Sequence, residues 1–261
     1  MADSDKPKPK QRQKASTKVV NDAALPANAL NLVMVGIGAS AGGLNALKAL
    51  IGSLSLNGRV SYVVAQHVSP RHNSLMVELL APRTNLAVEE LDEATTPRAD
   101  TIYVVPPNHD AEIKNGQLIP IDASAEAGPR PSIDRLFLAI AREFGEHSAG
   151  IVLSGTGRDG THGLRAVKEA NGVALVQDPG SAEYNGMPNS AIQAGLADLI
   201  LTPERIGEAL QQTVCKIGKL RDNLPKNSNE VPDSVNQIYN TVKLQTNLDL
   251  RHYKGSTVLP L

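Results

Sequence analysis

The chain has 261 residues, which is enough for one large α/β domain with tails. Hydrophobic residues make up 41% of the sequence and aromatic residues only 3%, so we expect a core of mainly aliphatic side chains. The formal net charge of −1 argues against a body that binds nucleic acid. The single cysteine, Cys215, excludes an intramolecular disulfide and fits a reducing compartment.

The sequence lacks the signals of membrane insertion and of secretion. No apolar run reaches the roughly 20 residues that a membrane-spanning helix needs. The first residues contain no apolar segment of the kind found in secretory signals. We therefore expect a cytoplasmic protein without direct membrane insertion.

Residues 1–28 are predicted to form a disordered basic tail. Lysines and an arginine alternate there with Pro, Gln and Ser, and no apolar residue recurs at a regular spacing. Docking to an acidic surface and simple solvation both fit this composition.

A folded body is predicted for residues 29–217, because short apolar runs alternate there with helical patterns. Strands are expected at 32–35, 60–65, 101–105, 150–153, 173–176 and 199–201. Helices are expected at 44–51, 73–80, 131–144, 161–170, 187–194 and 203–216. Asn115-Gly116 predicts a β-hairpin over residues 112–119. Together these elements predict an α/β fold with a doubly wound, mostly parallel, Rossmann-like sheet, helices on both faces and one antiparallel hairpin.

The glycine-rich stretch from Asn31 to Leu50 organises the rest of the chain. Its order of residue types predicts a strand, a tight glycine turn over 36–43, and a helix. Residues 38–42 fit G-x-S-x-G, the nucleophile elbow that exposes a serine oxygen. Residues 36–41 also fit G-x-G-x-x-A, the dinucleotide-binding fingerprint. A structural turn without chemistry is a third possibility, and this stretch alone leaves the three open.

Loops with polar or glycine residues follow four of the predicted strands, at 36–43, 66–70, 154–160 and 177–187. The carboxyl ends of parallel strands lie at one edge of the sheet, and ligands bind outside that edge. These loops therefore predict a functional site.

Three residues in these loops have the chemistry of a hydrolytic site. Ser40 stands in the turn after the first strand, and His67 directly follows the second. Asp159 either caps the helix that follows it or orients an imidazole, and the two roles are compatible. His109 also follows a strand and is an alternative base, although the preceding prolines displace it. The remaining histidines are expected in loops or on helix faces: His72, His147, His162 and His252.

Two kinds of bound group are disfavoured. A dinucleotide site needs an acidic residue at the end of the second strand, about 20 residues after the glycines. Gln66 and His67 occupy that position, and no Asp or Glu lies between Asn31 and Met76. No His-x-x-x-His spacing or cysteine pair indicates a metal site. We therefore expect neither a cofactor nor a metal.

Seven short motifs carry a family resemblance through their order and spacing. They are G-A-S-A-G-G at 38–43, Q-H-V-S-P at 66–70, Y-V-V-P-P-N at 103–108, P-S-I-D at 131–134, L-S-G-T-G-R-D-G at 153–160, Q-D-P at 177–179 and G-M-P at 186–188. With them, the stretch from about residue 32 to 210 resembles the catalytic domain of chemotaxis-type protein-glutamate methylesterases, the CheB family.

The resemblance implies a serine hydrolase with a triad of Ser40, His67 and Asp159. Its expected reaction is the demethylation of γ-glutamyl methyl esters, and the family's activity on glutamine amides would follow the same steps. The expected partner is a methylated chemoreceptor or a similar signalling protein, and no nucleic acid. A catalytically weak regulatory module of a chemosensory or two-component pathway is the alternative function.

Two departures from the family affect these expectations. Ala41 stands where the stand-alone chemotaxis enzymes usually have threonine, whose hydroxyl would help to position substrate or oxyanion. The chemotaxis enzymes also carry an N-terminal receiver domain, whereas only the basic tail precedes the domain here. We therefore expect no control by phosphorylation in cis, and separate receiver or methyltransferase proteins are possible partners.

The C-terminal residues are predicted to lie outside the methylesterase-like domain. Residues 218–234 have the composition of a polar linker. Residues 235–261 resemble the start of the small helical domain of chemoreceptor methyltransferases, the CheR family, truncated before the methyl-donor domain. A frayed C-terminal helix is the alternative, and no methyltransferase activity is expected.

Overall fold

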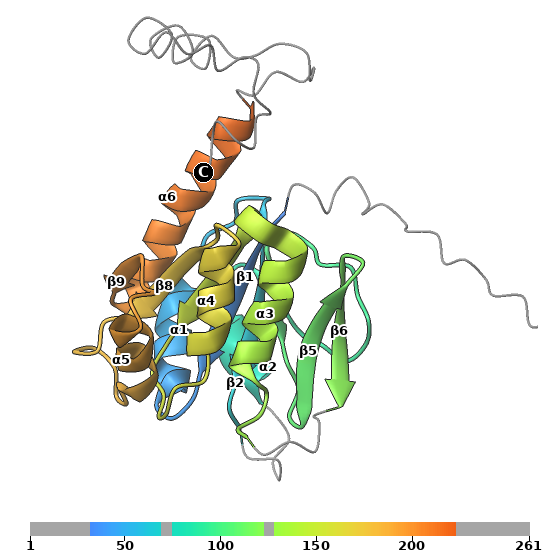
Figure 1. Ribbon diagram of the computed structural model, residues 1–261. Helices are drawn as coiled ribbons and strands as arrows, with labels where there is room; N and C mark the ends of the chain where they lie inside the picture. Colours follow the sequence, from blue (N-terminus) through green and yellow to red (C-terminus); the bar gives the residue numbers. More distant parts are fainter. Residues whose placement is uncertain (1–31, 69–74, 123–127, 223–261) are drawn as a thin grey trace, which may run out of the picture.

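The computed structural model describes residues 32–68, 75–122 and 128–222, and for residues 213–222 it describes the backbone alone (Figure 1). The basic tail and the segment 235–261 lie outside the described residues, so their predictions remain predictions. Among the described helices, none combines the length and the apolar character that crossing a membrane requires.

A seven-stranded parallel sheet forms the centre of the molecule, with the strand order β3-β4-β2-β1-β7-β8-β9 (Figure 1). The strands are β1 (Val33–Ala39), β2 (Val60–Gln66), β3 (Ala87–Glu90), β4 (Thr101–Val104), β7 (Ser148–Val152), β8 (Val173–Gln177) and β9 (Leu199–Leu201). Outward from β1 the sheet continues with β2, β4 and then β3 at the edge, and outward from β7 it continues with β8 and β9. The predicted doubly wound sheet is confirmed, and ligands bind where the strand order reverses in folds of this kind.

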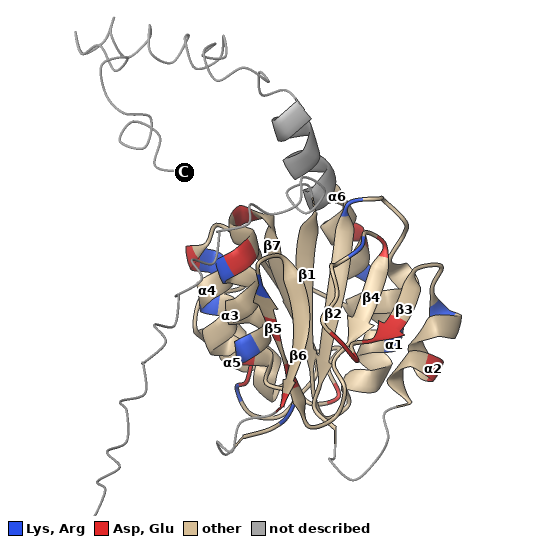
Figure 2. Cartoon of the chain, turned by 90° about the vertical axis from the view of Figure 1, so that its right-hand side faces the viewer, with Lys and Arg blue, Asp and Glu red and all other residues tan. Residues whose placement is uncertain are grey.

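Helices cover both faces of the sheet, as predicted. One face carries α1 (Gly43–Ser53), α2 (Met76–Leu80) and α6 (Pro203–Asp222), and the other carries α3 (Ile133–Phe144), α4 (Thr161–Glu169) and α5 (Gly186–Gln193). Two short 3₁₀ helices, η2 (Ala81–Arg83) and η3 (Gly145–His147), follow α2 and α3. The central strands β1, β2 and β7 carry no charged residue (Figure 2). They therefore bury apolar side chains on both faces, which is typical of parallel sheets.

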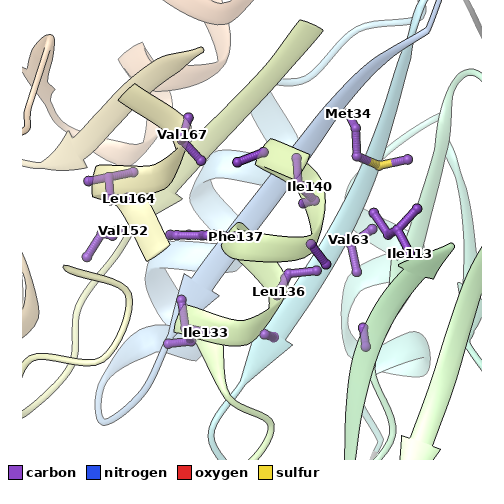
Figure 3. Close-up of a cluster of buried hydrophobic side chains, with 14 of the residues drawn as sticks. Met34, Val63, Ile113, Ile133, Leu136, Phe137, Ile140, Val152, Leu164 and Val167 are labelled. Carbon is purple, nitrogen blue, oxygen red and sulfur yellow. The ribbon is translucent and has the colours of Figure 1, made fainter. Parts of the chain in front are cut away.

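The predicted hairpin is confirmed and consists of β5 (His109–Lys114) and β6 (Gln117–Asp122), paired antiparallel. Its turn residues Asn115 and Gly116 both have positive φ, the type I′ geometry that Asn-Gly favours. Ile113 (Figure 3) and Leu118 belong to the same cluster of buried apolar side chains as α3. The hairpin thus packs beside α3 and helps to cover the same face of the sheet.

Gly36 and Gly38 lie inside β1, which corrects the prediction that they belong to the glycine turn. A Cβ on Gly36 would lie 2.7 Å from Cδ1 of Phe137, and one on Gly38 would lie 2.3 Å from Cγ2 of Ile133. These glycines are needed because α3 packs directly on the strand (Figure 3). The strand consequently extends to Ala39 rather than ending near residue 35.

Two further elements differ from prediction. The edge strand β3 was not predicted, because its sequence Ala-Val-Glu-Glu is partly exposed and lacks the apolar run of a buried strand. Helix α6 continues to Asp222, so the first residues of the predicted linker 218–234 are helical.

Candidate active site

The turn after β1 presents Ser40 at the carboxyl edge of the sheet. The Ser40 amide donates to the Ser154 carbonyl at 2.9 Å, and the Gly43 amide donates to the Ser40 carbonyl at 2.9 Å. Gly42 has φ of +68°, and a Cβ there would lie 2.7 Å from Cβ of Glu183. The turn therefore requires glycine at this position for both backbone conformation and space.

Strand register brings the predicted residues to one place. Ala39 at the end of β1 pairs with Gln66 at the end of β2, and the His67 amide donates to the Ala39 carbonyl at 2.9 Å. On the other side of β1, Gly38 pairs with the last residue of β7, whose following loop contains Asp159. The loops after three neighbouring strands thus supply the three side chains.

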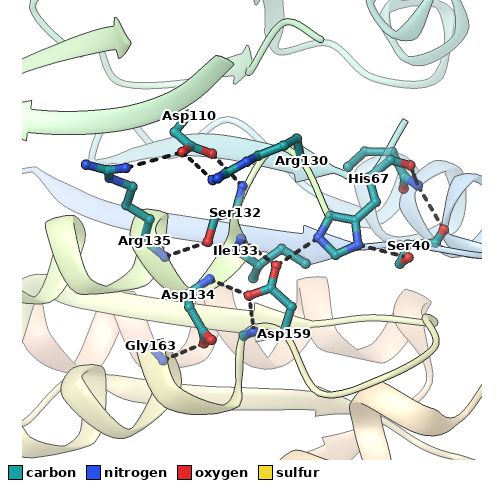
Figure 4. Close-up of polar contacts among 12 residues, drawn as sticks. Ser40, His67, Asp110, Arg130, Ser132, Ile133, Asp134, Arg135, Asp159 and Gly163 are labelled. Carbon is teal, nitrogen blue, oxygen red and sulfur yellow. Dashed lines mark hydrogen bonds and ion pairs between the residues drawn. The ribbon is translucent and has the colours of Figure 1, made fainter. Parts of the chain in front are cut away.

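The three side chains form a hydrogen-bonded series (Figure 4). Oγ of Ser40 lies 3.0 Å from Nδ1 of His67, and Nε2 of His67 lies 2.8 Å from Oδ2 of Asp159. The side chains of His67 and Asp159 are 10% and 13% exposed. An ionised carboxylate only accepts hydrogen bonds, so Nε2 of the neutral imidazole carries the proton and Nδ1 accepts the serine hydroxyl. This tautomer leaves Nδ1 as the base toward Ser40.

Asp159 is held by backbone amides as well as by the imidazole. Its carboxylate accepts hydrogen bonds from Ile133 at 3.0 Å, Asp134 at 2.9 Å and Gly160 at 2.9 Å. Burial by itself raises the pKa of Asp159, but the hydrogen bonds from His67 and from the α3 amides outweigh it and lower the pKa. Asp159 is therefore ionised at neutral pH.

Of the two compatible roles considered for Asp159, capping of the helix that follows it is wrong. The N-cap of α4 is Gly160, which makes no side-chain cap. Asp159 instead binds the first two amides of α3, a helix that precedes it in the sequence. Helix N-termini favour a negative charge, so α3 stabilises the ionised carboxylate.

Gln66 connects the two catalytic candidates, a role that sequence reasoning missed. Its Nε2 donates to the Ser40 carbonyl at 2.8 Å and to the His67 carbonyl at 3.1 Å. Its Oε1 is buried and has no hydrogen-bond partner among the described residues. The only sequence signal was the position of Gln66 directly before His67.

Ser154 holds the elbow against the loop after β8. Its Oγ donates to the Ala41 carbonyl at 2.9 Å and accepts from the Tyr184 amide at 3.0 Å. Its amide donates to Oε1 of the buried Gln177 at 2.8 Å. A pocket of about 440 Å³ opens beside these residues, lined by Gly42, Asn45, Ala46, Ala49, Ser154, Gln177, Gly180, Ser181, Ala182, Glu183, Thr202, Pro203 and Glu204.

The alternative base, His109, lies away from these groups in β5. Its Nδ1 donates to the Pro107 carbonyl at 2.8 Å, and its Nε2 lies 3.6 Å from Oδ1 of Asp122. His147 lies in η3 and His162 in α4, whereas His72 and His252 are outside the described residues.

Fold and site together define an α/β protein with a serine, a histidine and a carboxylate arranged as in serine hydrolases. A family model described as CheB methylesterase matches residues 35–210. The chain belongs to the CheB methylesterase family.

Individual relatives agree with this assignment. A protein of Leptospira interrogans is 33% identical over 180 residues, which cover 69% of this chain and 93% of that protein. The protein-glutamate methylesterase/protein-glutamine glutaminase of Moorella thermoacetica is 34% identical over 74% of this chain but only 47% of its own length. The crystal structure of the Thermotoga maritima CheB methylesterase catalytic domain has a TM-score of 0.65 and 27% identity, covering 70% of this chain and 98% of that one.

Proposed function

We propose that this protein is a protein-glutamate methylesterase in which Ser40 is the nucleophile, His67 the general base and Asp159 the orienting carboxylate. The observation that carries the proposal is the hydrogen-bonded series from Ser40 through His67 to Asp159 in a chain of this family. Relatives with the same domain are named protein-glutamate methylesterase/protein-glutamine glutaminase.

In the first half of the reaction, Oγ of Ser40 attacks the carbonyl carbon of the γ-glutamyl methyl ester while Nδ1 of His67 takes the hydroxyl proton. Asp159 accepts a hydrogen bond from Nε2–H throughout, without taking up the proton, and stabilises the imidazolium that forms. The C–O bond to methoxide then breaks, and the methoxide leaves as methanol with the proton from Nδ1. The product is a γ-glutamyl ester of Ser40.

In the second half, His67 takes a proton from water, and the resulting nucleophile attacks the acyl-enzyme. Collapse releases the glutamate side chain, and the proton returns to Oγ of Ser40. A glutamine amide would follow the same steps, with ammonia as the leaving group in place of methanol.

The amides of Ala41 and Gly42 are the proposed oxyanion hole. The neighbouring amides of Ser40 and Gly43 already donate to carbonyls, whereas those of Ala41 and Gly42 have no acceptor among the described residues. The amide of Thr156, in the loop after β7, is a further candidate donor. Loss of one oxyanion donor typically costs about 3–4 kcal/mol of transition-state stabilisation.

The proposed substrate is a methylated chemoreceptor or a similar signalling protein in the cytoplasm. Separate receiver or methyltransferase proteins are the proposed regulators. Ala41, which lacks the hydroxyl usual at this position, favours a second candidate function, a regulatory module with weak turnover.

We further propose that residues 235–261 begin a small helical domain like that of the CheR family. This segment lies beyond the family match, which ends at residue 210. Limited proteolysis of the full chain should cleave within residues 223–234 and leave 235–261 as a protected fragment. Uniform degradation from the C-terminus would contradict the proposal.

The function is tested by incubating the purified chain with the cytoplasmic domain of a chemoreceptor that carries ³H-methyl esters and counting volatile methanol. Wild type should release methanol and Ser40→Ala should not. Equal release by both proteins would overturn the assignment of the nucleophile. No release by wild type, with Ser40 still reactive toward a fluorophosphonate, would mean that this receptor is not the substrate.

A further inference from the structure

Asp110 is a fully buried carboxylate that the proposed mechanism does not use. It lies in β5 and is the one charged side chain among the buried polar residues that the structure describes. Its Oδ2 is 2.8 Å from Nη1 of Arg130 and 3.4 Å from Nη1 of Arg135. Its Oδ1 accepts a 2.7 Å hydrogen bond from the Ser132 amide (Figure 4). A buried charge is costly unless it is paired and hydrogen-bonded, and both conditions hold here.

The segment that Asp110 holds, residues 130–134, contacts the site from two sides. The Arg130 carbonyl accepts a 3.2 Å hydrogen bond from the amide of Val68, the residue after the general base. The first two amides of α3, at the end of the same segment, donate to Asp159. Through this one segment, Asp110 therefore supports the contact to the residue after His67 and the contacts to the Asp159 carboxylate.

We propose that Asp110 is a positioning residue of the triad, which fixes residues 130–134 and thereby the geometry between Asp159 and His67. The inference rests on the proposed function, because this geometry affects rates only if Ser40 is the nucleophile. Asp110 touches neither Ser40 nor the ester, so its effect is on orientation rather than on a chemical step.

Asp110→Asn tests the proposal with little change in volume. The asparagine oxygen can still accept from the Ser132 amide, but its NH₂ group would face the Arg130 guanidinium, which also only donates. The segment must then shift away from its present position. A displacement of about 1 Å in a catalytic constellation can cost as much as 100-fold in rate, so we expect kcat to fall by about 10- to 100-fold with KM nearly unchanged.

Arg142→Gln is the matched control. Nη2 of Arg142 donates to the Ile113 carbonyl at 2.6 Å and lies 3.5 Å from Oε1 of Glu112. This contact also joins α3 to β5, but at the end of α3 away from the site. Arg142→Gln should lower Tm and leave kcat within about twofold of wild type.

For wild type and both variants, the experiment measures Tm, the rate at which a fluorophosphonate labels Ser40, kcat and KM for methyl-ester hydrolysis, and the low-field proton NMR spectrum. Slower labelling by Asp110→Asn alone, with the low-field proton resonance of the His67–Asp159 hydrogen bond lost, is the expected result. Equal labelling by Asp110→Asn and Arg142→Gln would overturn the positioning role.

Labelling needs no particular ester, so it separates this inference from the proposed function. If wild type is labelled but releases no methanol, the proposed substrate is contradicted, and the test of the positioning role remains valid. If Asp110→Asn does not fold, Arg130→Lys keeps the positive charge but loses the fork geometry of the guanidinium, and it should slow labelling by about threefold or more. Labelling of Arg130→Lys at the wild-type rate would then overturn the inference.

Discussion

Asp134 lies at the start of α3 and Asp159 lies just before α4, and the carboxylate of each accepts hydrogen bonds from backbone amides in the first turn of the other helix. Asp159, just before α4, accepts hydrogen bonds from the first two amides of α3. Asp134, in the first turn of α3, accepts a 2.7 Å hydrogen bond from the amide of Gly163 in the first turn of α4 (Figure 4). A Cβ on Gly163 would lie 2.6 Å from the Asp134 carbonyl oxygen, so the two helices meet closely here. The proposed catalytic carboxylate is thus fixed by the packing of two helices.

Asp159→Asn should lower kcat for methyl-ester hydrolysis by about 10⁴, the loss that this change causes in a serine protease with a Ser-His-Asp triad. The amide would favour the wrong imidazole tautomer, because its NH₂ group can face Nε2 as a donor. Steady-state kinetics with matched circular dichroism spectra measure the effect. A loss of less than tenfold in the folded variant would show that His67 does not need this carboxylate.

The pH dependence of stability should report the lowered pKa of Asp159. Because the folded state binds this proton less readily than the unfolded state, the stabilisation is fully present above the unfolded pKa of about 4. It is lost as the pH falls through the folded-state pKa. Urea unfolding from about pH 2 to about pH 6 should show a shallower acid limb for Asp159→Asn than for wild type. If the unfolding free energies of wild type and Asp159→Asn changed in parallel with pH, the lowered pKa of Asp159 would be contradicted.

The pKa of Asp134 is shifted in the opposite direction, so its effect on the pH dependence of stability should be opposite as well. Burial, together with the charge of Asp159, raises its pKa, although the hydrogen bond from Gly163 lowers it. The folded state therefore binds this proton more readily than the unfolded state, and stability decreases as the pH rises through the raised pKa. Asp134→Asn should remove that decrease. A variant whose unfolding free energy keeps the wild-type slope above about pH 4 would be inconsistent with this account.

Gly42→Ala and Gly58→Ala form a matched pair for the elbow. Both glycines have φ of +68°, but a Cβ on Gly42 meets Glu183 and Ser154, whereas one on Gly58 meets nothing within 4 Å. Both variants should lose about 1–2 kcal/mol of unfolding free energy through backbone strain. Only Gly42→Ala should also slow fluorophosphonate labelling, by tenfold or more. Equal labelling rates would show that the space beside Gly42 does not matter.

Gln66→Met should reduce turnover with little change in side-chain volume. The substitution removes the donor shared by the Ser40 and His67 carbonyls, and a buried acceptor left unsatisfied costs about 1–3 kcal/mol. We expect a lower Tm and a kcat reduced by at least tenfold. Unchanged kcat in the less stable variant would mean that Gln66 stabilises the fold without orienting the site.

The parallel sheet, and the position of Ser40, His67 and Asp159 at one edge of it, could be predicted from the sequence. Buried strands and the loops that follow them have strong local signals. Sequence reasoning misassigned Gly36 and Gly38, since their role depends on α3, which lies about 100 residues further along the chain. It missed the edge strand β3, which is polar and partly exposed.

The support around the site could not be predicted from local patterns. Two of the amides that bind Asp159 belong to α3, and the partners of Asp110 lie on that helix and the segment before it. Such contacts between distant segments exist only once the helices have packed. The P-S-I-D motif marks the segment, but it does not show which carboxylate the segment meets.

Fluorophosphonate labelling followed by mass spectrometry of the modified peptide tests directly whether Ser40 is a nucleophile activated by His67. We expect one adduct, on Ser40, in wild type, and none in Ser40→Ala or His67→Gln variants that remain folded. Labelling of another residue, or of Ser40 at the same rate without His67, would contradict the proposed nucleophile and base.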